Sequence, residues 1–98
     1  MNRATALDLL RKRFPELQAM GVRSIGLFGS VARDEAGPDS DVDVLVEFEG
    51  KATFDGYMDV LFALQEWFGC RVDLVTPRSL ERKPQWRKRI EAEVVHVA

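Results

Sequence analysis

The sequence predicts an α/β fold in which a small mixed β-sheet is flanked by helices. Short apolar runs typical of strands alternate along the chain with stretches in which apolar residues recur every three or four positions. In addition, 46% of the 98 residues are hydrophobic, which is enough to build one core but not two. We therefore expect one domain over residues 1–98.

The first helix is expected to begin after Thr5, a candidate N-cap, because apolar residues recur from there at helical spacing. Pro15 disfavours helical geometry in the residue before it, so this helix should end near Arg13. A second, shorter helical turn is expected over residues 15–20, with Gly21 as its left-handed stop.

Two strands are expected in the middle of the chain. Residues 22–28 form an apolar run that predicts the first strand, followed by one or two helical turns over residues 31–35. A loop rich in turn-forming residues covers residues 36–40. Residues 41–48 place Val or Phe at every second position, which predicts a second strand with one buried face.

The second long helix is expected over residues 54–68, where a glycine follows as the stop signal. Six large apolar residues fall near one side of it: Phe54, Met58, Leu61, Phe62, Leu64 and Phe68.

Three shorter elements complete the predicted fold. Residues 72–76 are a third strand that Pro77 ends, and Pro84 suits the first turn of a basic helix over residues 84–92. A last strand is expected over residues 94–97.

Composition limits the partners and the compartment. The net charge of −2 does not draw nucleic acid to the whole surface, so any such contact would be local. Cys70 is the single cysteine, which excludes an internal disulfide and favours a reducing cytoplasm. No apolar run could span a bilayer and the N-terminus has no secretory apolar segment, so we expect a soluble and complete protein.

Asp41 and Asp43 form a carboxylate pair at the start of the second strand. Two residues apart on a strand, they project from one face with their backbones roughly 7 Å apart. Carboxylates within about 4 Å of each other repel by roughly 4 kcal/mol at an effective dielectric of 20, and a divalent cation reverses that sign. Oxygen ligands favour Mg²⁺ or Mn²⁺ over zinc.

Asp73 stands in an otherwise apolar strand, where an unpaired buried carboxylate would be costly. We therefore expect it beside the aspartate pair. Three converging carboxylates are typical of a two-metal site, in which one ion activates the attacking oxygen and the other neutralises the leaving group. The alternative is a salt bridge between Asp73 and Arg71 or another basic residue.

Gly29 and Ser30 lie where the first strand turns abruptly into a helix. The glycine lets the backbone approach a ligand, the first helical amides point outward, and the serine hydroxyl can donate to a phosphate oxygen. These features predict a triphosphate cradle. Arg33 follows one turn later and either adds a positive charge to the phosphates or is plain solvated helix surface.

Together these residues resemble the minimal nucleotidyltransferases of the DNA polymerase β superfamily. The match consists of Gly29-Ser30, ten further residues, and then Asp41-Val42-Asp43. Residues 71–76 are similar to the third-carboxylate strand of that family. The resemblance covers residues 22–76 and, more weakly, continues to residue 97.

The resemblance implies a nucleotidyltransferase fold and an enzyme that moves AMP from ATP onto a tyrosine of a partner protein. Gly29 and Ser30 would bind the triphosphate, Asp41 and Asp43 would bind the metals, and Asp73 would be the third ligand and a candidate base. The resemblance further implies that the partner is a HEPN-type ribonuclease toxin and that this chain is its antitoxin.

Two other functions stay open. The first is a non-catalytic antitoxin that only covers its toxin, although stoichiometric binding needs no carboxylate triad. The second is a nucleotidyltransferase acting on RNA or a small molecule, which would use the six basic residues between Arg78 and Arg89. The sequence leaves open the acceptor, the base of the nucleotide, the number of nucleotides transferred and the oligomeric state.

Overall fold

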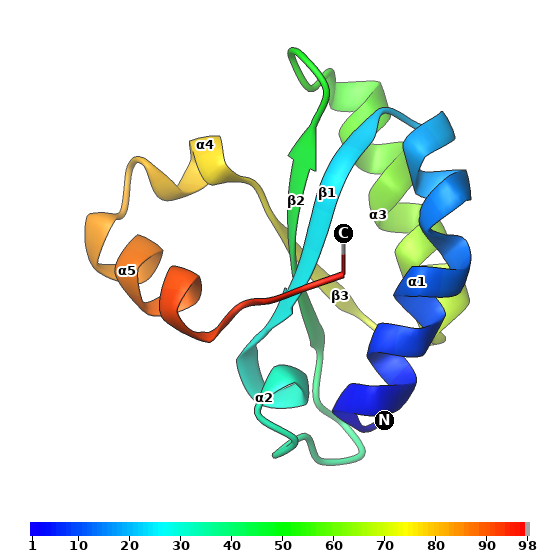
Figure 1. Cartoon of the computed structure of the whole chain (residues 1–98), viewed down its shortest axis with the longest axis vertical. Helices are drawn as coiled ribbons and strands as arrows, with labels where there is room; N and C mark the ends of the chain where they lie inside the picture. The colour runs from blue at the N-terminus through cyan, green and yellow to red at the C-terminus, as the bar shows by residue number, and fades with distance from the viewer. Residues whose placement is uncertain (98) are drawn as a thin grey trace.

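The computed structural model describes residues 1–97, which fold around a mixed four-stranded sheet with the strand order β3-β2-β1-β4. β1 pairs antiparallel with β2 and β4, whereas β2 and β3 run parallel. Helices α1 and α3 lie on one side of the sheet and α4 and α5 on the other, with α2 at the end of β1 (Figure 1). The predicted α/β architecture is confirmed. The elements are α1 (Arg3–Ala19), β1 (Val22–Phe28), α2 (Gly29–Ala32), β2 (Val42–Phe48), α3 (Phe54–Phe68), β3 (Val72–Val75), α4 (Pro77–Leu80), α5 (Pro84–Glu93) and β4 (Val95–His96).

The two central strands agree closely with the prediction. β1 has the predicted bounds, and β2 begins one residue later than predicted, so Asp41 precedes the strand. Val42, Val44 and Val46 are buried, as the alternation predicts. They join the main hydrophobic core, which the inner faces of α1 and α3 complete. Asp43 therefore belongs to the opposite face of the sheet from α1 and α3.

The predicted helix break at Pro15 was wrong. α1 continues through the proline, and its N-cap is Asn2, whose side chain accepts a hydrogen bond from the amide of Thr5 at 2.8 Å. A proline inside a helix costs about 3 kcal/mol. Leu10 and Leu17 are fully buried on either side of it, and each buried leucine contributes roughly 1.5–3 kcal/mol. Their burial in one core outweighs the local cost and keeps the helix continuous.

The bounds of α3 are as predicted, but its predicted apolar face was partly wrong. Val60, Leu64 and Phe68, spaced by four residues, are the buried side chains. Phe54 and Phe62 are 77% and 57% exposed. A helix that packs on a sheet buries only a narrow stripe, and residues spaced by four follow that stripe better than the wider set.

α4 was not predicted, because a proline after a strand was interpreted only as its end. Pro77 instead occupies the first turn of a short helix. Thr76 and Ser79 form a capping box: the Ser79 amide donates to Thr76 Oγ1 at 3.2 Å and the Thr76 amide donates to Ser79 Oγ at 3.1 Å.

α4 and α5 together form an arm, residues 77–93, that faces the end of β1 (Figure 1). Leu80 and Ile90 from this arm pack on Phe28 in a small second core. The predicted basic helix and final strand are confirmed as α5 and β4. No helix among the described residues is long and apolar enough to cross a membrane.

Candidate active site

Gly29 marks the turn from β1 into α2 and lies directly against Asp43. Its φ of +75° is in the left-handed region that favours glycine. A Cβ at this position would overlap the Asp43 carboxylate, with Cγ at 2.9 Å and Oδ2 nearer still. The backbone of the predicted triphosphate cradle and the predicted metal ligand therefore touch, and only a residue without a side chain permits this contact.

Asp41 and Asp73, the other two predicted carboxylates, lie near enough to Asp43 to raise its pKa. Asp43 pairs with Asp73 across the parallel strands β2 and β3, and Asp41 precedes β2. Burial and then the negative charges of Asp73 and Asp41 together raise the pKa of Asp43 to about 6. Arg33 acts in the opposite direction. An oxygen-only donor set that repels itself in this way fits a hard divalent cation.

The buried environment predicted for Asp73 was wrong. Its side chain is exposed because β3 is an edge strand and Asp73 alternates with the buried Val72 and Leu74. Within residues 1–97 Asp73 forms no salt bridge with Arg71, so the alternative role is absent too. The same described residues contain no cluster of three or more acidic, histidine or cysteine side chains placed to hold a metal ion. Mutual repulsion of carboxylates opposes such gathering until a cation is bound.

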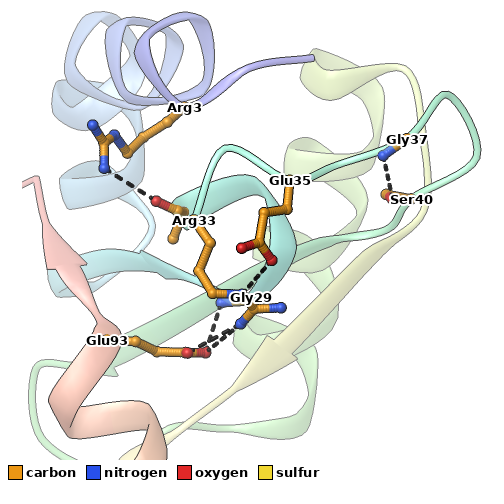
Figure 2. A network of polar contacts seen from close by, with 8 residues as sticks. Arg3, Gly29, Arg33, Glu35, Gly37, Ser40 and Glu93 are labelled. Atoms are coloured by element: carbon orange, nitrogen blue, oxygen red, sulfur yellow. Dashed lines mark hydrogen bonds and ion pairs between the residues drawn. The ribbon is translucent and has the colours of Figure 1, made fainter.

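Glu93, the last residue of α5, reaches the predicted cradle from the other end of the chain (Figure 2). Its carboxylate accepts a hydrogen bond from the Gly29 amide at 3.0 Å and two from Arg33 Nη1 at 3.0 and 3.2 Å. Sequence reasoning missed Glu93, because its partners are about sixty positions away and only the packing of α5 against α2 brings them together. An anionic group therefore already occupies two of the donors predicted for phosphate, the Gly29 amide and Arg33.

Arg33 lines the first cavity and makes two ion pairs that the sequence did not predict. Arg33 Nε donates to Glu35 at 3.1 Å while Nη1 holds Glu93 (Figure 2). These hydrogen bonds, first with Glu35 and then with Glu93, raise the pKa of Arg33 further above its usual value. The guanidinium is thus charged and held beside the cradle by two carboxylates.

Two adjoining cavities of about 530 and 650 Å³ open between the arm and the end of the sheet. Asp43 lines both of them. The first cavity brings together four predicted site residues: Gly29, Ser30, Arg33 and Asp43. The second contains Asp73 and is bordered by basic side chains: Arg78, Arg82 and Lys83. Asp41 lines neither cavity, so of the predicted residues it is the least enclosed.

A glycine turn from strand to helix, set against carboxylates at the mouth of a cleft, is typical of enzymes that act on nucleoside triphosphates. The chain belongs to the family of nucleotidyltransferase domains, whose model matches residues 7–96.

Its relatives agree with this assignment. The chain is 44% identical over 88 residues to the protein adenylyltransferase MntA of Thermococcus cleftensis, covering 90% of this chain and 81% of that one. A solved structure described as a minimal nucleotidyltransferase superposes with a TM-score of 0.74 at 35% identity, covering 97% of this chain and 95% of the other. The predicted resemblance to minimal nucleotidyltransferases is confirmed.

A more distant solved structure shares the fold. It is the MNT antitoxin in complex with a tri-AMPylated HEPN toxin from Shewanella oneidensis, with a TM-score of 0.67 and 18% identity. The match covers 94% of this chain and 71% of that chain.

Proposed function

We propose that this chain is a metal-dependent nucleotidyltransferase that transfers AMP from ATP to a partner protein, as the antitoxin of a pair with a HEPN-type toxin. One observation carries the proposal: the Gly29 backbone lies against the Asp43 carboxylate. A triphosphate held at Gly29 would thus have its reacting phosphate beside the acidic group. The names of the relatives support the acceptor class, since they are a protein adenylyltransferase and an antitoxin bound to an AMPylated toxin.

In this proposal the cradle holds the leaving end of ATP. The Gly29 amide and the Ser30 hydroxyl donate to the β- and γ-phosphates, and Arg33 adds a positive charge. A hydroxyl of the acceptor, most simply a tyrosine, forms a bond to the α-phosphorus while the bond to the β-phosphate oxygen breaks. Pyrophosphate leaves and the acceptor keeps AMP. The hydroxyl proton passes to Asp73, whose exposed carboxylate lines the second cavity.

Asp41, Asp43 and Asp73 are the residues that would hold Mg²⁺ or Mn²⁺. The fit is supported by their oxygen-only chemistry and by the raised pKa of Asp43, which burial and then the charges of Asp73 and Asp41 produce. When bound, the divalent ion supplies a Lewis acid that polarises the α-phosphate and offsets charge on the leaving pyrophosphate.

We further propose that residues 1–98 act as one domain in the cytoplasm. The described part of the chain shares one main core, and the free thiol of Cys70 suits a reducing compartment. In this proposal the acceptor hydroxyl belongs to a bound partner protein.

The experiment is intact-protein mass spectrometry of the partner encoded beside this chain, after incubation with this chain, ATP and Mg²⁺. We expect AMP mass on the partner, and none when Ser30→Ala and Asp43→Asn are combined. A partner that stays unmodified yet is inhibited by the double variant would establish binding alone as the mechanism.

A second candidate acceptor is RNA, favoured by the basic residues beside Asp73 in the second cavity: Arg78, Arg82 and Lys83. Labelling of tRNA rather than the partner in the same reaction would establish this acceptor instead.

Substitution of Glu93 by glutamine is expected to tighten ATP binding about five- to tenfold in Mg²⁺. Glu93 accepts hydrogen bonds from the Gly29 amide and from Arg33, two groups that we assign to the triphosphate. Two anions cannot both occupy these donors. Glutamine removes the charge at nearly the same size. Titration calorimetry measures the change. The matched control is Glu91→Gln, since Glu91 lies on the same helix and, within residues 1–97, its ion pair is with Arg87 alone. Weaker binding in Glu93→Gln would instead make Glu93 a positioning residue for Arg33.

Gly29→Ala is expected to destroy ATP binding, whereas Gly21→Ala should preserve it. Both glycines have positive φ, at +75° and +91°, so an alanine strains either backbone by about 1–2 kcal/mol. A Cβ at Gly21 meets nothing within 4 Å, but one at Gly29 overlaps Asp43. Urea denaturation should show the larger loss for Gly29→Ala, and equal ATP affinity in the two variants would contradict the contact with Asp43.

A further inference from the structure

Trp86 is a large aromatic side chain that stands at the cleft with no assigned role. It lies in the first turn of α5 and is 61% exposed. It lines both cavities, together with Phe28 and Ile90. Those two side chains are only 8% and 4% exposed, so they form the floor of the cleft while Trp86 forms a wall. An exposed indole on a cleft wall is a surface on which a flat ring can stack.

The position of Trp86 relative to the cradle suits a nucleoside. The first cavity is lined by Gly29 and Ser30 of the cradle and also by Trp86. A nucleotide whose triphosphate occupies the cradle therefore carries its sugar and base into a space that Trp86 borders. Asp43 lines the same cavity, so the α-phosphate would lie between the cradle and the base.

Lys83 does not separate Trp86 from the cavity of the cradle. The Lys83 ammonium lies over the Trp86 ring, 5.1 Å from its centroid. Lys83 lines only the second cavity, whereas Trp86 also lines the first one with Gly29 and Ser30. Within residues 1–97 no other cation lies over this ring.

We propose that Trp86 stacks on the base of the nucleotide substrate and so supplies the base-binding contact of this enzyme. The inference rests on the proposed function and adds a subsite to it. Stacking needs no hydrogen bonds to the edge of the base, so Trp86 favours large purine rings over pyrimidines without distinguishing adenine from guanine.

The test compares a ligand that has a base with one that lacks it. Affinities for ATP and for inorganic tripolyphosphate, both in Mg²⁺, are measured for the wild type, Trp86→Ala, Trp86→Phe and Phe62→Ala. Phe62→Ala is the matched control, because Phe62 is also an exposed aromatic but lies on α3 and lines neither cavity. We expect Trp86→Ala to weaken ATP binding about tenfold and to leave tripolyphosphate binding within about twofold. Trp86→Phe keeps a ring and should stay close to the wild type.

A second readout follows the indole itself. Trp67→Phe leaves Trp86 as the remaining tryptophan of the two in the chain. Its emission should be quenched by ATP and unaffected by tripolyphosphate.

Several results would overturn the stacking role. Equal losses of ATP and tripolyphosphate in Trp86→Ala would show that Trp86 supports the fold of the arm. Unchanged ATP affinity together with weaker binding of a partner protein would make Trp86 a docking residue. Equal wild-type affinity for ATP and tripolyphosphate would refute a base contact and leave the proposed function intact. A wild type that binds neither ligand would refute the proposed function and the stacking role together.

Discussion

Asp43→Asn is expected to reduce nucleotide transfer at least about 1000-fold. The substitution removes the carboxylate that lines both cavities and touches the Gly29 backbone. In the proposed function Asp43 is a metal ligand, and loss of such a charged ligand forfeits several kcal/mol of transition-state stabilisation. Each 1.36 kcal/mol changes the rate tenfold. Transfer is followed with labelled ATP. The matched control is Asp39→Asn, which removes an exposed carboxylate from the neighbouring loop and should transfer normally.

The same substitution should stabilise the metal-free protein at neutral pH. Burial and nearby carboxylates raise the pKa of Asp43 from 3.8 to about 6. A raised folded-state pKa favours folding fully below pH 3.8, and this contribution is lost as the pH rises through about 6. Asparagine avoids the loss, which we put at about 1 kcal/mol after solvent screening.

Thermal melts in chelator at pH 5 and pH 7 measure this effect. The melting temperature of Asp43→Asn should exceed that of the wild type at pH 7, by a margin that shrinks at pH 5. A variant that melts lower than the wild type at both pH values would show that Asp43 stabilises the fold. Near wild-type transfer by Asp43→Asn would remove it from the site.

Chelation of divalent cations is expected to weaken ATP binding about 100-fold. Without a cation, a triphosphate in the cleft would meet the carboxylates of Asp43, Asp73 and Glu93, and each close pair of like charges opposes binding. A 100-fold change corresponds to about 2.7 kcal/mol, which one or two such pairs supply. Titration calorimetry in EDTA and in millimolar Mg²⁺ gives both affinities.

The Asp43→Asn variant sharpens the test of this metal dependence. With one repelling charge removed, it should bind ATP more tightly than the wild type in EDTA and gain much less from Mg²⁺. If the wild type has the same affinity in both buffers, the acidic group is not the site of the triphosphate.

Local patterns were enough to predict most of the fold. The alternation of residues 41–48 identified β2 and its buried valines, because a strand with one buried face alternates regardless of its distant neighbours. The helix break at Pro15 was predicted wrongly because the local cost of a proline is known from the sequence. The burial of Leu10 and Leu17, which offsets that cost, depends on the assembled core. Phe62 was predicted to lie on the buried face of α3 but is exposed, because which side chains become buried also depends on the assembled core.

The structure brings some of the predicted site residues together, and their roles stay predictions. Gly29 and Ser30 directly follow β1, and Asp43 lies on β2, which pairs antiparallel with β1. This local pairing brings the three residues into one cavity. Glu93 and Trp86 lie on α5, and their place beside the cradle depends on how the arm packs on Phe28. No periodicity or spacing within α5 indicates that contact, so the sequence offered no signal for either residue.

The most direct test uses ATP labelled at the α-phosphate or at the γ-phosphate, in parallel reactions of this chain with the proposed partner protein. ATP labelled at the α-phosphate should label the partner in Mg²⁺, and ATP labelled at the γ-phosphate should not, because AMP is transferred and pyrophosphate leaves. Asp43→Asn should label in neither reaction, and Asp39→Asn should match the wild type. Label from the γ-phosphate alone would make this chain a kinase, and equal α-labelling by Asp43→Asn would contradict the assignment of the active site.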